Sequence, residues 1–186
     1  MRSAPDSLQT ERLVLRRWRA SDHVPFARLN GDPHVMRFFA RTRTAEESRA
    51  EAERFDAAFD WEGFGFWAVA APGVADFIGF VGCFPVNPAL AFAPGVEAGW
   101  RLDRPFWGRG YAPEAARAAL ADVFGRCEIP EIVADAAVRN RPSQRVMERL
   151  GMRRDPAEDF DHPLVPEGHP MRRHVLYRLS AEDFSA

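Results

Sequence analysis

Residues 99–120, which read GWRLDRPFWGRGYAPEAARAAL, decide the fold of this chain. Gly108, Gly110 and Ala112 stand at alternate positions, and an alanine-rich segment of helical character follows at once. A loop without side chains lets backbone N–H groups converge, and a helix that follows adds its unpaired N–H groups and positive dipole end. The bend at 108–112 is therefore predicted to bind a phosphate or pyrophosphate. A tight turn that needs small residues for packing is the other interpretation.

The segments around this bend alternate between strand-like and helix-like patterns. Period-two alternation and apolar runs predict strands at 12–19, 65–72, 77–86, 96–102, 131–138 and 172–180. Capping signals and helical spacing predict helices at 21–29, 45–59, 113–126 and 140–151. Ser21 or Asp22 would cap the first helix, and Thr44 with Glu47 forms a capping box before the second. We therefore expect one α/β domain over residues 1–186, with its core at about 10–180, around one mixed sheet.

Composition excludes several classes of function. The chain has 186 residues, 46% of them hydrophobic, and a formal net charge of −2, so no nucleic-acid or membrane partner is expected. All 25 basic residues are arginine, which excludes Schiff-base chemistry, pyridoxal phosphate and the lysine-bearing Walker loop. Cys83 and Cys127 have neither metal-site nor disulfide spacing, and no signal peptide is recognisable at the N-terminus. These features predict a cytoplasmic protein with reduced thiols.

A dinucleotide-binding fold is disfavoured by the position of the bend. Such a fold carries G-x-G-x-x-G after its first strand and an acidic residue about 20 residues later. Here the bend lies past the middle of the chain and reads G-x-G-x-A. An NAD-dependent oxidoreductase is therefore the weakest of the hypotheses.

Residues 99–120, followed by NRPSQRVMERLGM at 140–152, resemble the acyl-CoA-binding core of the GNAT N-acetyltransferase superfamily. More narrowly, they resemble the branch that includes ribosomal-protein N-terminal (alanine/serine) acetyltransferases. The likeness extends from TERLVLRRWRASD at 10–22 to HVLYRLS at 174–180. It implies a single-domain α/β fold with a central mixed, mostly antiparallel sheet flanked by helices. It also implies acetyl-CoA as cosubstrate, no metal, and an amine acceptor.

The resemblance assigns roles in coenzyme binding. The pyrophosphate would lie on backbone amides of the bend, and the pantetheine along the preceding strand and beside a family asparagine. Arg145, next to the proposed coenzyme helix, is the first candidate for the 3′-phosphate, and Arg153, Arg154, Arg172 and Arg173 are weaker ones. Trp107 occupies a position where the superfamily usually has Gln or Arg, which removes one polar phosphate contact. The residues implied are Trp100, Arg101, Leu102, Trp107, Gly108, Arg109, Gly110, Tyr111, Ala112, Asn140, Ser143 and Arg145.

Acetylation of an amine requires removal of its proton, because an alkylammonium has a pKa near 10. Glu97 is the first candidate for the general base, since several family members carry a catalytic glutamate near this position. It alternates onto the face opposite Val96 and Ala98. A structural carboxylate paired with an arginine is the other interpretation, and Asp135 and Asp161 are substitutes for the base.

The thiolate that leaves benefits from a hydrogen-bond donor. Many relatives place a tyrosine in the helix after the asparagine, but Met147 stands there and cannot donate a proton. The resembled branch offers a serine instead, which matches Ser143. The other interpretation is that Ser143 caps its helix. A backbone N–H near Leu102 is the expected donor to the oxyanion.

Three histidines lie in the C-terminal part of the chain. His162, His169 and His174 are interpreted as solvated residues of a loop at the acceptor pocket rather than as a zinc site. Aromatic residues at 38, 39, 61, 64, 66 and 67 are mostly expected in the core, with one or two at the pocket.

The function expected is an acetyl-CoA-dependent N-acetyltransferase acting by direct transfer in a ternary complex. The alternative is a non-catalytic acyl-CoA-binding sensor or interaction module. A homodimer is the prior for a small enzyme.

Overall fold

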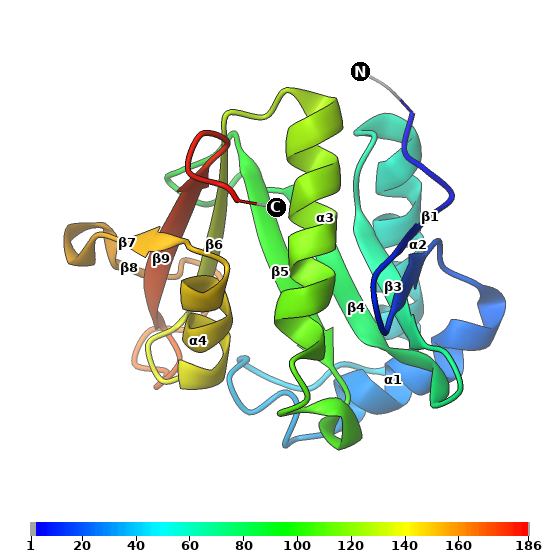
Figure 1. Ribbon diagram of the computed structural model, residues 1–186. Helices are drawn as coiled ribbons and strands as arrows, with labels where there is room; N and C mark the ends of the chain where they lie inside the picture. The colour runs from blue at the N-terminus through cyan, green and yellow to red at the C-terminus, as the bar shows by residue number, and fades with distance from the viewer. Residues whose placement is uncertain (1–2, 186) are drawn as a thin grey trace.

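The computed structural model describes residues 3–185, which form one mixed sheet with helices on both faces (Figure 1). The strands are β1 (Ser7–Gln9), β2 (Val14–Arg16), β3 (Phe66–Ala71), β4 (Ala75–Pro85), β5 (Val96–Leu102), β6 (Glu131–Ala137), β7 (Arg153–Arg154), β8 (Phe160–Asp161) and β9 (Arg173–Ser180). The α-helices are α1 (His23–Gly31), α2 (Ala45–Trp61), α3 (Tyr111–Cys127) and α4 (Arg141–Arg149), with short 3-10 turns at Ala20–Asp22, Arg104–Phe106 and Pro156–Glu158. The expected α/β fold class is confirmed.

The sheet runs in the order β1-β2-β3-β4-β5-β6-β9-β7, with β8 also paired to β9. In the part of the chain that the structure describes, each pairing is antiparallel except that of β5 with β6. The sheet is thus mixed and mostly antiparallel, as expected. The parallel pair β5–β6 requires a crossover, and α3 supplies it.

Local signals account for most helix ends. Thr44 and Glu47 form the predicted capping box, in which each side chain accepts a hydrogen bond from the other residue's backbone N–H. Gly151 follows α4 with a φ of 82°, the left-handed conformation that glycine allows after a helix. Helix α3 begins at Tyr111, ahead of the predicted start at 113, because Gly110 adopts a left-handed conformation and becomes the N-cap.

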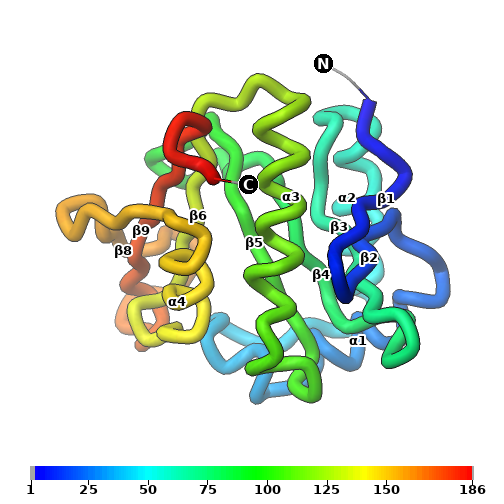
Figure 2. Tube along the Cα trace, in the orientation of Figure 1, coloured from blue at the N-terminus to red at the C-terminus, as the bar shows by residue number. Residues whose placement is uncertain are grey.

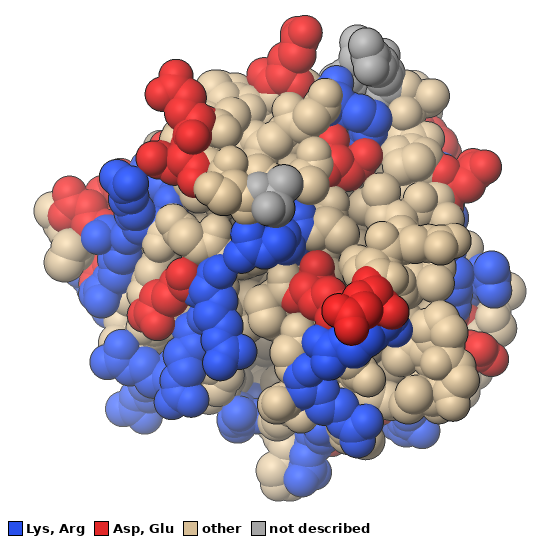
Figure 3. All heavy atoms as spheres, viewed as in Figure 1, with Lys and Arg blue, Asp and Glu red and all other residues tan. Residues whose placement is uncertain are grey.

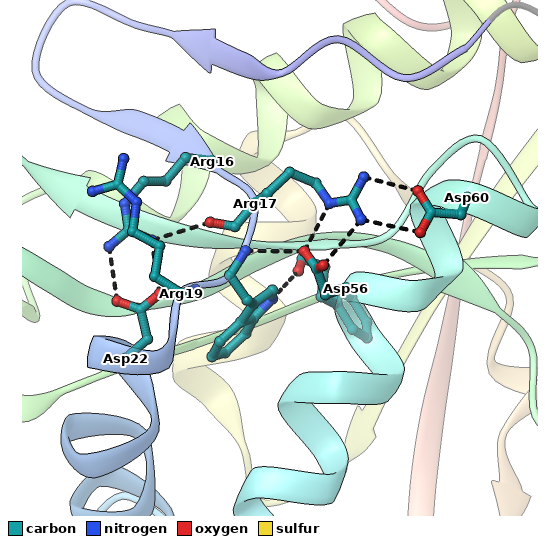
Figure 4. Close-up of polar contacts among 8 residues, drawn as sticks. Arg16, Arg17, Arg19, Asp22, Asp56 and Asp60 are labelled. Carbon is teal, nitrogen blue, oxygen red and sulfur yellow. Dashed lines mark hydrogen bonds and ion pairs between the residues drawn. The ribbon is translucent and has the colours of Figure 1, made fainter.

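Asp22 occupies the predicted N-cap position of α1, but its side chain makes no capping hydrogen bond to that helix. Asp22 is buried and makes a paired contact with Arg16, with Nη1 to Oδ2 at 2.7 Å and Nη2 to Oδ1 at 2.8 Å (Figure 4). The carboxylate also accepts a hydrogen bond from the backbone N–H of Arg19. Beside this pair, Arg17 bridges Asp56 and Asp60 of α2. A buried guanidinium outcompetes an exposed backbone amide for the carboxylate, because both charges need a partner.

Helices α3 and α4 cover one face of the sheet, and α1 and α2 cover the other (Figure 1). The core under α3 and α4 contains Leu120, Ile132, Met147, Val175 and many smaller apolar side chains. The core under α1 and α2 is aromatic, with Phe26, Phe55, Phe66 and Phe80 in contact. Because side chains alternate along a strand, β3 and β4 contribute to both cores.

Strands β5 and β6 separate along their length, and this opening is the feature that positions the site. β5 pairs with β4 from Val96 to Leu102, but with β6 only at Val96 and Glu97. Beyond Glu97 the edge of β5 that faces β6 therefore has no strand partner within residues 3–185. Figure 1 shows the two strands close together at one end and apart where α4 begins.

Candidate active site

The bend between β5 and α3 exposes backbone N–H groups. Gly108 and Gly110 have φ angles of 72° and 79°, which side chains rarely tolerate. Gly110 has no side chain with which to cap α3, so among the described residues the N–H groups at the helix start receive no side-chain cap. A ligand anion at this point would interact with those N–H groups and with the positive end of the helix dipole.

Arg12, which sequence reasoning did not single out, holds this bend in place. Its Nη1 donates to the carbonyl of Arg109 at 2.9 Å, and its guanidinium lies over the ring of Tyr111 at 4.9 Å. Its Nε donates to Glu114 at 2.7 Å, and Thr10 donates to the same carboxylate at 2.6 Å. These hydrogen bonds to Thr10 and Arg12 hold the pKa of Glu114 below its ordinary value, against its burial, which raises it. The one acidic group in the first turn of α3 is thereby neutralised, which favours an anion nearby.

Trp107 closes the start of the bend. Its indole N–H donates to the carbonyl of Leu102 at 2.7 Å, and the guanidinium of Arg37 lies over its rings at 4.8 Å. The indole therefore supports the strand end instead of offering a polar group to a phosphate.

A cleft of about 440 Å³ lies beside the bend. Its walls are the end of β5, the bend, the start of α4, and the connection between α1 and α2, which crosses below the opening (Figure 2). Of the residues predicted for coenzyme binding, the cleft is lined by Trp100, Arg101, Leu102, Trp107, Gly108, Gly110, Tyr111, Ala112, Asn140, Ser143 and Arg145. Arg109 is the exception, because it is exposed and only its carbonyl is engaged, by Arg12.

The aromatic residues at 38, 39, 61, 64, 66 and 67 lie in different parts of the structure. Phe38 and Phe39 line the cleft, whereas Phe64, Phe66 and Trp67 are buried in the core and Trp61 is exposed elsewhere. Two of these six aromatic residues therefore lie at the cleft. Phe38 and Phe39 differ from the other four aromatic residues because they lie in the connection between α1 and α2.

Asn140 and Ser143 form one unit at the start of α4. The side-chain carbonyl of Asn140 accepts a hydrogen bond from the Ser143 backbone N–H at 3.2 Å, so Asn140 is the N-cap. The Asn140 amide also donates to the Ser143 Oγ at 3.0 Å. Ser143 therefore does not cap the helix itself, and its hydroxyl hydrogen is free to point into the cleft. Met147, one turn later, is buried in the core and supplies no polar group.

Arg145 and Arg149 stand exposed on the rim of the cleft. Among the described residues neither side chain forms an ion pair, so both remain available to an anion. Figure 3 shows arginine side chains gathered over α4 and the start of α3. By contrast, Arg153, Arg154, Arg172 and Arg173 are each paired with an aspartate.

Glu97 does not line this cleft. It lies where the β5–β6 pairing ends, with Phe84 and Val133 as its neighbours on β4 and β6. Burial raises the pKa of Glu97 to about 8, and the charge of Asp135 adds to the rise, while Arg54 opposes it. No arginine forms an ion pair with Glu97 in the described part of the chain. The interpretation of Glu97 as a structural carboxylate paired with an arginine is therefore wrong, and a carboxyl group with this pKa exchanges protons near neutral pH.

Arg101 is buried on the α1–α2 face of β5 and links the cleft to the helices behind it. It donates to Asn30 at 2.6 Å, lies 3.7 Å from Glu51 and packs against the ring of Phe39 at 4.4 Å. Burial lowers the pKa of Arg101 to about 10, against the attraction of Glu51. Its Nε has no hydrogen-bond partner among the described residues, so one polar atom beside the cleft remains unsatisfied.

The interpretation of His162, His169 and His174 as solvated loop residues is wrong for His174. It lies in β9, its side chain is 13% exposed, and its Nδ1 lies 2.5 Å from the Asp135 carboxylate. The ring of His162 lies 4.7 Å from that of His174. His169 lies apart, in the turn before β9, where its Nδ1 accepts from the Met171 N–H. Sequence reasoning missed this cluster because strand register, not sequence spacing, assembles it.

The fold and the cleft together define the class of protein. A mixed sheet whose parallel pair opens beside a glycine bend and a helix N-terminus is the α/β fold of the GNAT acetyltransferases. Residues 12–153 match the acetyltransferase (GNAT) domain, and the chain belongs to the GNAT acetyltransferase family. No helix among residues 3–185 is both long enough and apolar enough to span a membrane.

Similar proteins agree with this placement. The chain is 31% identical over 139 residues to the FsC-acetyl coenzyme A-N(2)-transacetylase of Aspergillus fumigatus, a match that covers 70% of this chain and 58% of that protein. The structure of a GNAT-family acetyltransferase from Bacillus anthracis is 25% identical, with a TM-score of 0.78 over 95% of this chain and 99% of the other. Ribosomal-protein-S5-alanine acetyltransferase from Vibrio fischeri shares the fold, with a TM-score of 0.74, 19% identity, and 97% and 99% of the two chains covered.

Proposed function

We propose that this protein transfers the acetyl group of acetyl-CoA to a primary amine by direct attack in a ternary complex. The observation that carries the proposal is the separation of β5 and β6 beside the bare bend. One end of the cleft offers N–H groups to a diphosphate, and the open edge of β5 offers backbone groups to an extended arm. Acetyl-CoA supplies an acyl group activated as a thioester.

The residues present fit this coenzyme. A Cβ atom at Gly110 would lie 3.3 Å from Arg12, and the φ of 79° is strained for any side chain, so the bend is open only with glycine there. Arg145 and Arg149 on the rim suit the phosphate farther from the thioester. Asn140 orients Ser143, whose hydroxyl donates to the sulfur that leaves. Glu97, once deprotonated, accepts a proton from the amine.

The acceptor is proposed as a primary amine, either a protein N-terminus or a small molecule. The likeness to the ribosomal-protein branch and the name of the Vibrio fischeri neighbour favour peptides that begin with alanine or serine. The name of the Aspergillus relative, an acetyl coenzyme A-N(2)-transacetylase, favours transfer to a nitrogen atom without naming a peptide. Both classes therefore belong in the test.

The test combines binding with turnover. Acetyl-CoA should raise the melting temperature of the protein, whereas NAD should not. Thiol release from acetyl-CoA is then measured over a panel of Ala- and Ser-initiated tetrapeptides, free amino acids and spermidine. Turnover with one class of amine supports the proposal. Stabilisation by acetyl-CoA without thiol release on any panel member would instead support the acyl-CoA sensor.

Glu97→Gln tests the general base, because glutamine has nearly the same shape as glutamate but no carboxylate. Loss of the general base should lower kcat on the order of a hundredfold. Glu167→Gln, an exposed carboxylate in the loop before β9, is the control and should behave as wild type. Equal turnover by both variants would remove Glu97 from the mechanism.

A further inference from the structure

Asp135, His162 and His174 form a cluster on the same face of the sheet as Glu97. Val133 pairs with Glu97, and Asp135 follows Val133 after one full pleat of β6, so the Glu97 and Asp135 side chains point to the same side. His174 comes from the neighbouring strand β9. Asp135 thus stands on the β6 wall of the opening, between Glu97 and His174, and its charge acts on Glu97.

Hydrogen bonds determine which nitrogen of His174 is free. Nδ1 lies 2.5 Å from a carboxylate oxygen of Asp135, and since a carboxylate only accepts, Nδ1 carries the hydrogen. In the neutral ring, Nε2 then has an unprotonated lone pair. Among the described residues no group donates to Nε2. This is the arrangement by which a carboxylate orients an imidazole as a proton acceptor and stabilises the imidazolium that results.

The same three side chains could be considered as ligands of a metal ion, since one atom from each lies within 4.8 Å of the others. The bonding of His162 opposes this interpretation. Its Nδ1 accepts a hydrogen bond from the Leu164 N–H at 3.2 Å, so in the neutral ring Nε2 carries the hydrogen. A histidine that ligates through Nε2 would instead carry its hydrogen on Nδ1, against the Leu164 N–H.

The proposed reaction requires two proton acceptors. An ammonium group loses one proton before its nitrogen can bond to the acetyl carbon. When the carbon–sulfur bond breaks and the sulfur leaves with the electron pair, the new amide nitrogen must have lost a second proton. Glu97 accounts for one of these protons. Met147 cannot take part in the other transfer, because its thioether has no exchangeable proton and lies in the core.

We infer that His174, oriented by Asp135, is a second proton acceptor of the acetyl transfer and takes the ammonium proton of the acceptor on Nε2. The inference rests on the proposed function. The imidazolium formed is paired with Asp135 and later releases the proton to solvent, while Glu97 takes the proton lost as the amide forms. Atoms balance, because ammonium and thioester give amide, free thiol or thiolate, and released protons.

The surroundings of His174 support this role. From β6 it meets Asp135, from β8 it meets the ring of Phe160 at 5.8 Å, and from the segment after β8 it meets His162. Burial lowers the pKa of His162, against the attraction of Asp135 and together with the repulsion of His174 and Arg172. Asp161 and Arg173 flank the same hairpin and form an ion pair with each other at 3.3 Å. The negative charges of Asp135 and of deprotonated Glu97 on this face of the sheet would favour a cationic acceptor.

A first experiment tests the geometry without any acceptor. In protein labelled with ¹⁵N-histidine, the neutral ring of His174 should show a strongly deshielded Nδ1 proton and an unprotonated Nε2. Asp135→Asn should remove the deshielding. A proton on Nε2 in the wild type would overturn the inference, and so would bound metal in the purified protein whose removal changes these signals.

A second experiment tests the role in turnover, using the panel amine with the highest kcat/KM. His174→Gln should lower kcat about tenfold or more and remove one ionisation from the pH profile of kcat/KM, with acetyl-CoA affinity unchanged. Asp135→Asn should also lower kcat and change the pH profile of kcat/KM. It replaces His174→Gln as the test variant if that protein does not fold. His169→Gln, from the same hairpin but outside the cluster, is the control and should match wild type.

The outcomes separate the two proposals. Full turnover and an unchanged pH profile in His174→Gln and Asp135→Asn would overturn this inference and leave the proposed function intact. A wild-type protein that binds acetyl-CoA and acetylates no amine of the panel would overturn both.

Discussion

The sharpest consequence of the structure is that Glu97→Gln should make the protein more stable at alkaline pH. Burial, assisted by Asp135, raises the pKa of Glu97 from an ordinary 4.5 to about 8 in the folded protein. The folded state therefore binds the proton more tightly than the unfolded chain does. Wild-type stability should fall as the pH rises from about 4.5 to about 8 and then level off, because above pH 8 both states are deprotonated and the folded state carries a buried charge.

The magnitude follows from the same two values. At roughly 1.4 kcal/mol per pH unit, the difference between 4.5 and about 8 corresponds to about 5 kcal/mol, which is an upper bound because Glu97 keeps part of its surface exposed to solvent. Urea denaturation of wild type and Glu97→Gln at pH 5 and pH 9 measures this quantity. The variant should gain little at pH 5 and about 2–5 kcal/mol at pH 9.

Glu167→Gln is the control, because its carboxylate is exposed in a loop. It should change the free energy of unfolding by less than about 0.5 kcal/mol at either pH. A Glu97→Gln protein no more stable than wild type at pH 9, or equally stabilised at both pH values, would refute the argument that Glu97 is held in an apolar environment. The predicted gain in stability together with a loss of turnover is the pattern expected of a group kept for function.

Other variants test the coenzyme side of the cleft. Ser143→Ala should lower kcat several-fold in the thiol-release assay with little change in acetyl-CoA affinity, and an unchanged kcat would exclude a role at the sulfur. Gly110→Ala, at a φ of 79°, should weaken acetyl-CoA binding about tenfold by calorimetry. Gly73→Ala, at a φ of 74° in the β3–β4 turn, carries the same backbone strain and should bind acetyl-CoA as wild type does. Trp107→Phe removes the indole donor to Leu102 and should raise the KM for acetyl-CoA about fivefold, since one hydrogen bond is worth about 1 kcal/mol; an unchanged KM would show that this bond does not position the bend.

Much of the fold and one half of the site could be predicted from local sequence. The strand at 96–102, the capping box at Thr44 and the helix between Asn140 and Gly151 are where short-range signals predicted them. Strands β1, β7 and β8 were not predicted, because segments of two or three residues carry no periodicity. Asp22 stands at the predicted N-cap position, but its carboxylate binds Arg16 instead of an N–H group of α1.

The sequence by itself determined the class of this protein and the coenzyme end of its cleft. A side-chain-free bend, the helix after it and the Asn140–Ser143 pair are local in the chain, and backbone conformation and capping follow from neighbouring residues. Only the tertiary structure decided the protonation of Glu97 and the meeting of Asp135 with His174. Burial and strand register depend on which segments pack together, and no spacing along the chain encodes the 2.5 Å contact between β6 and β9.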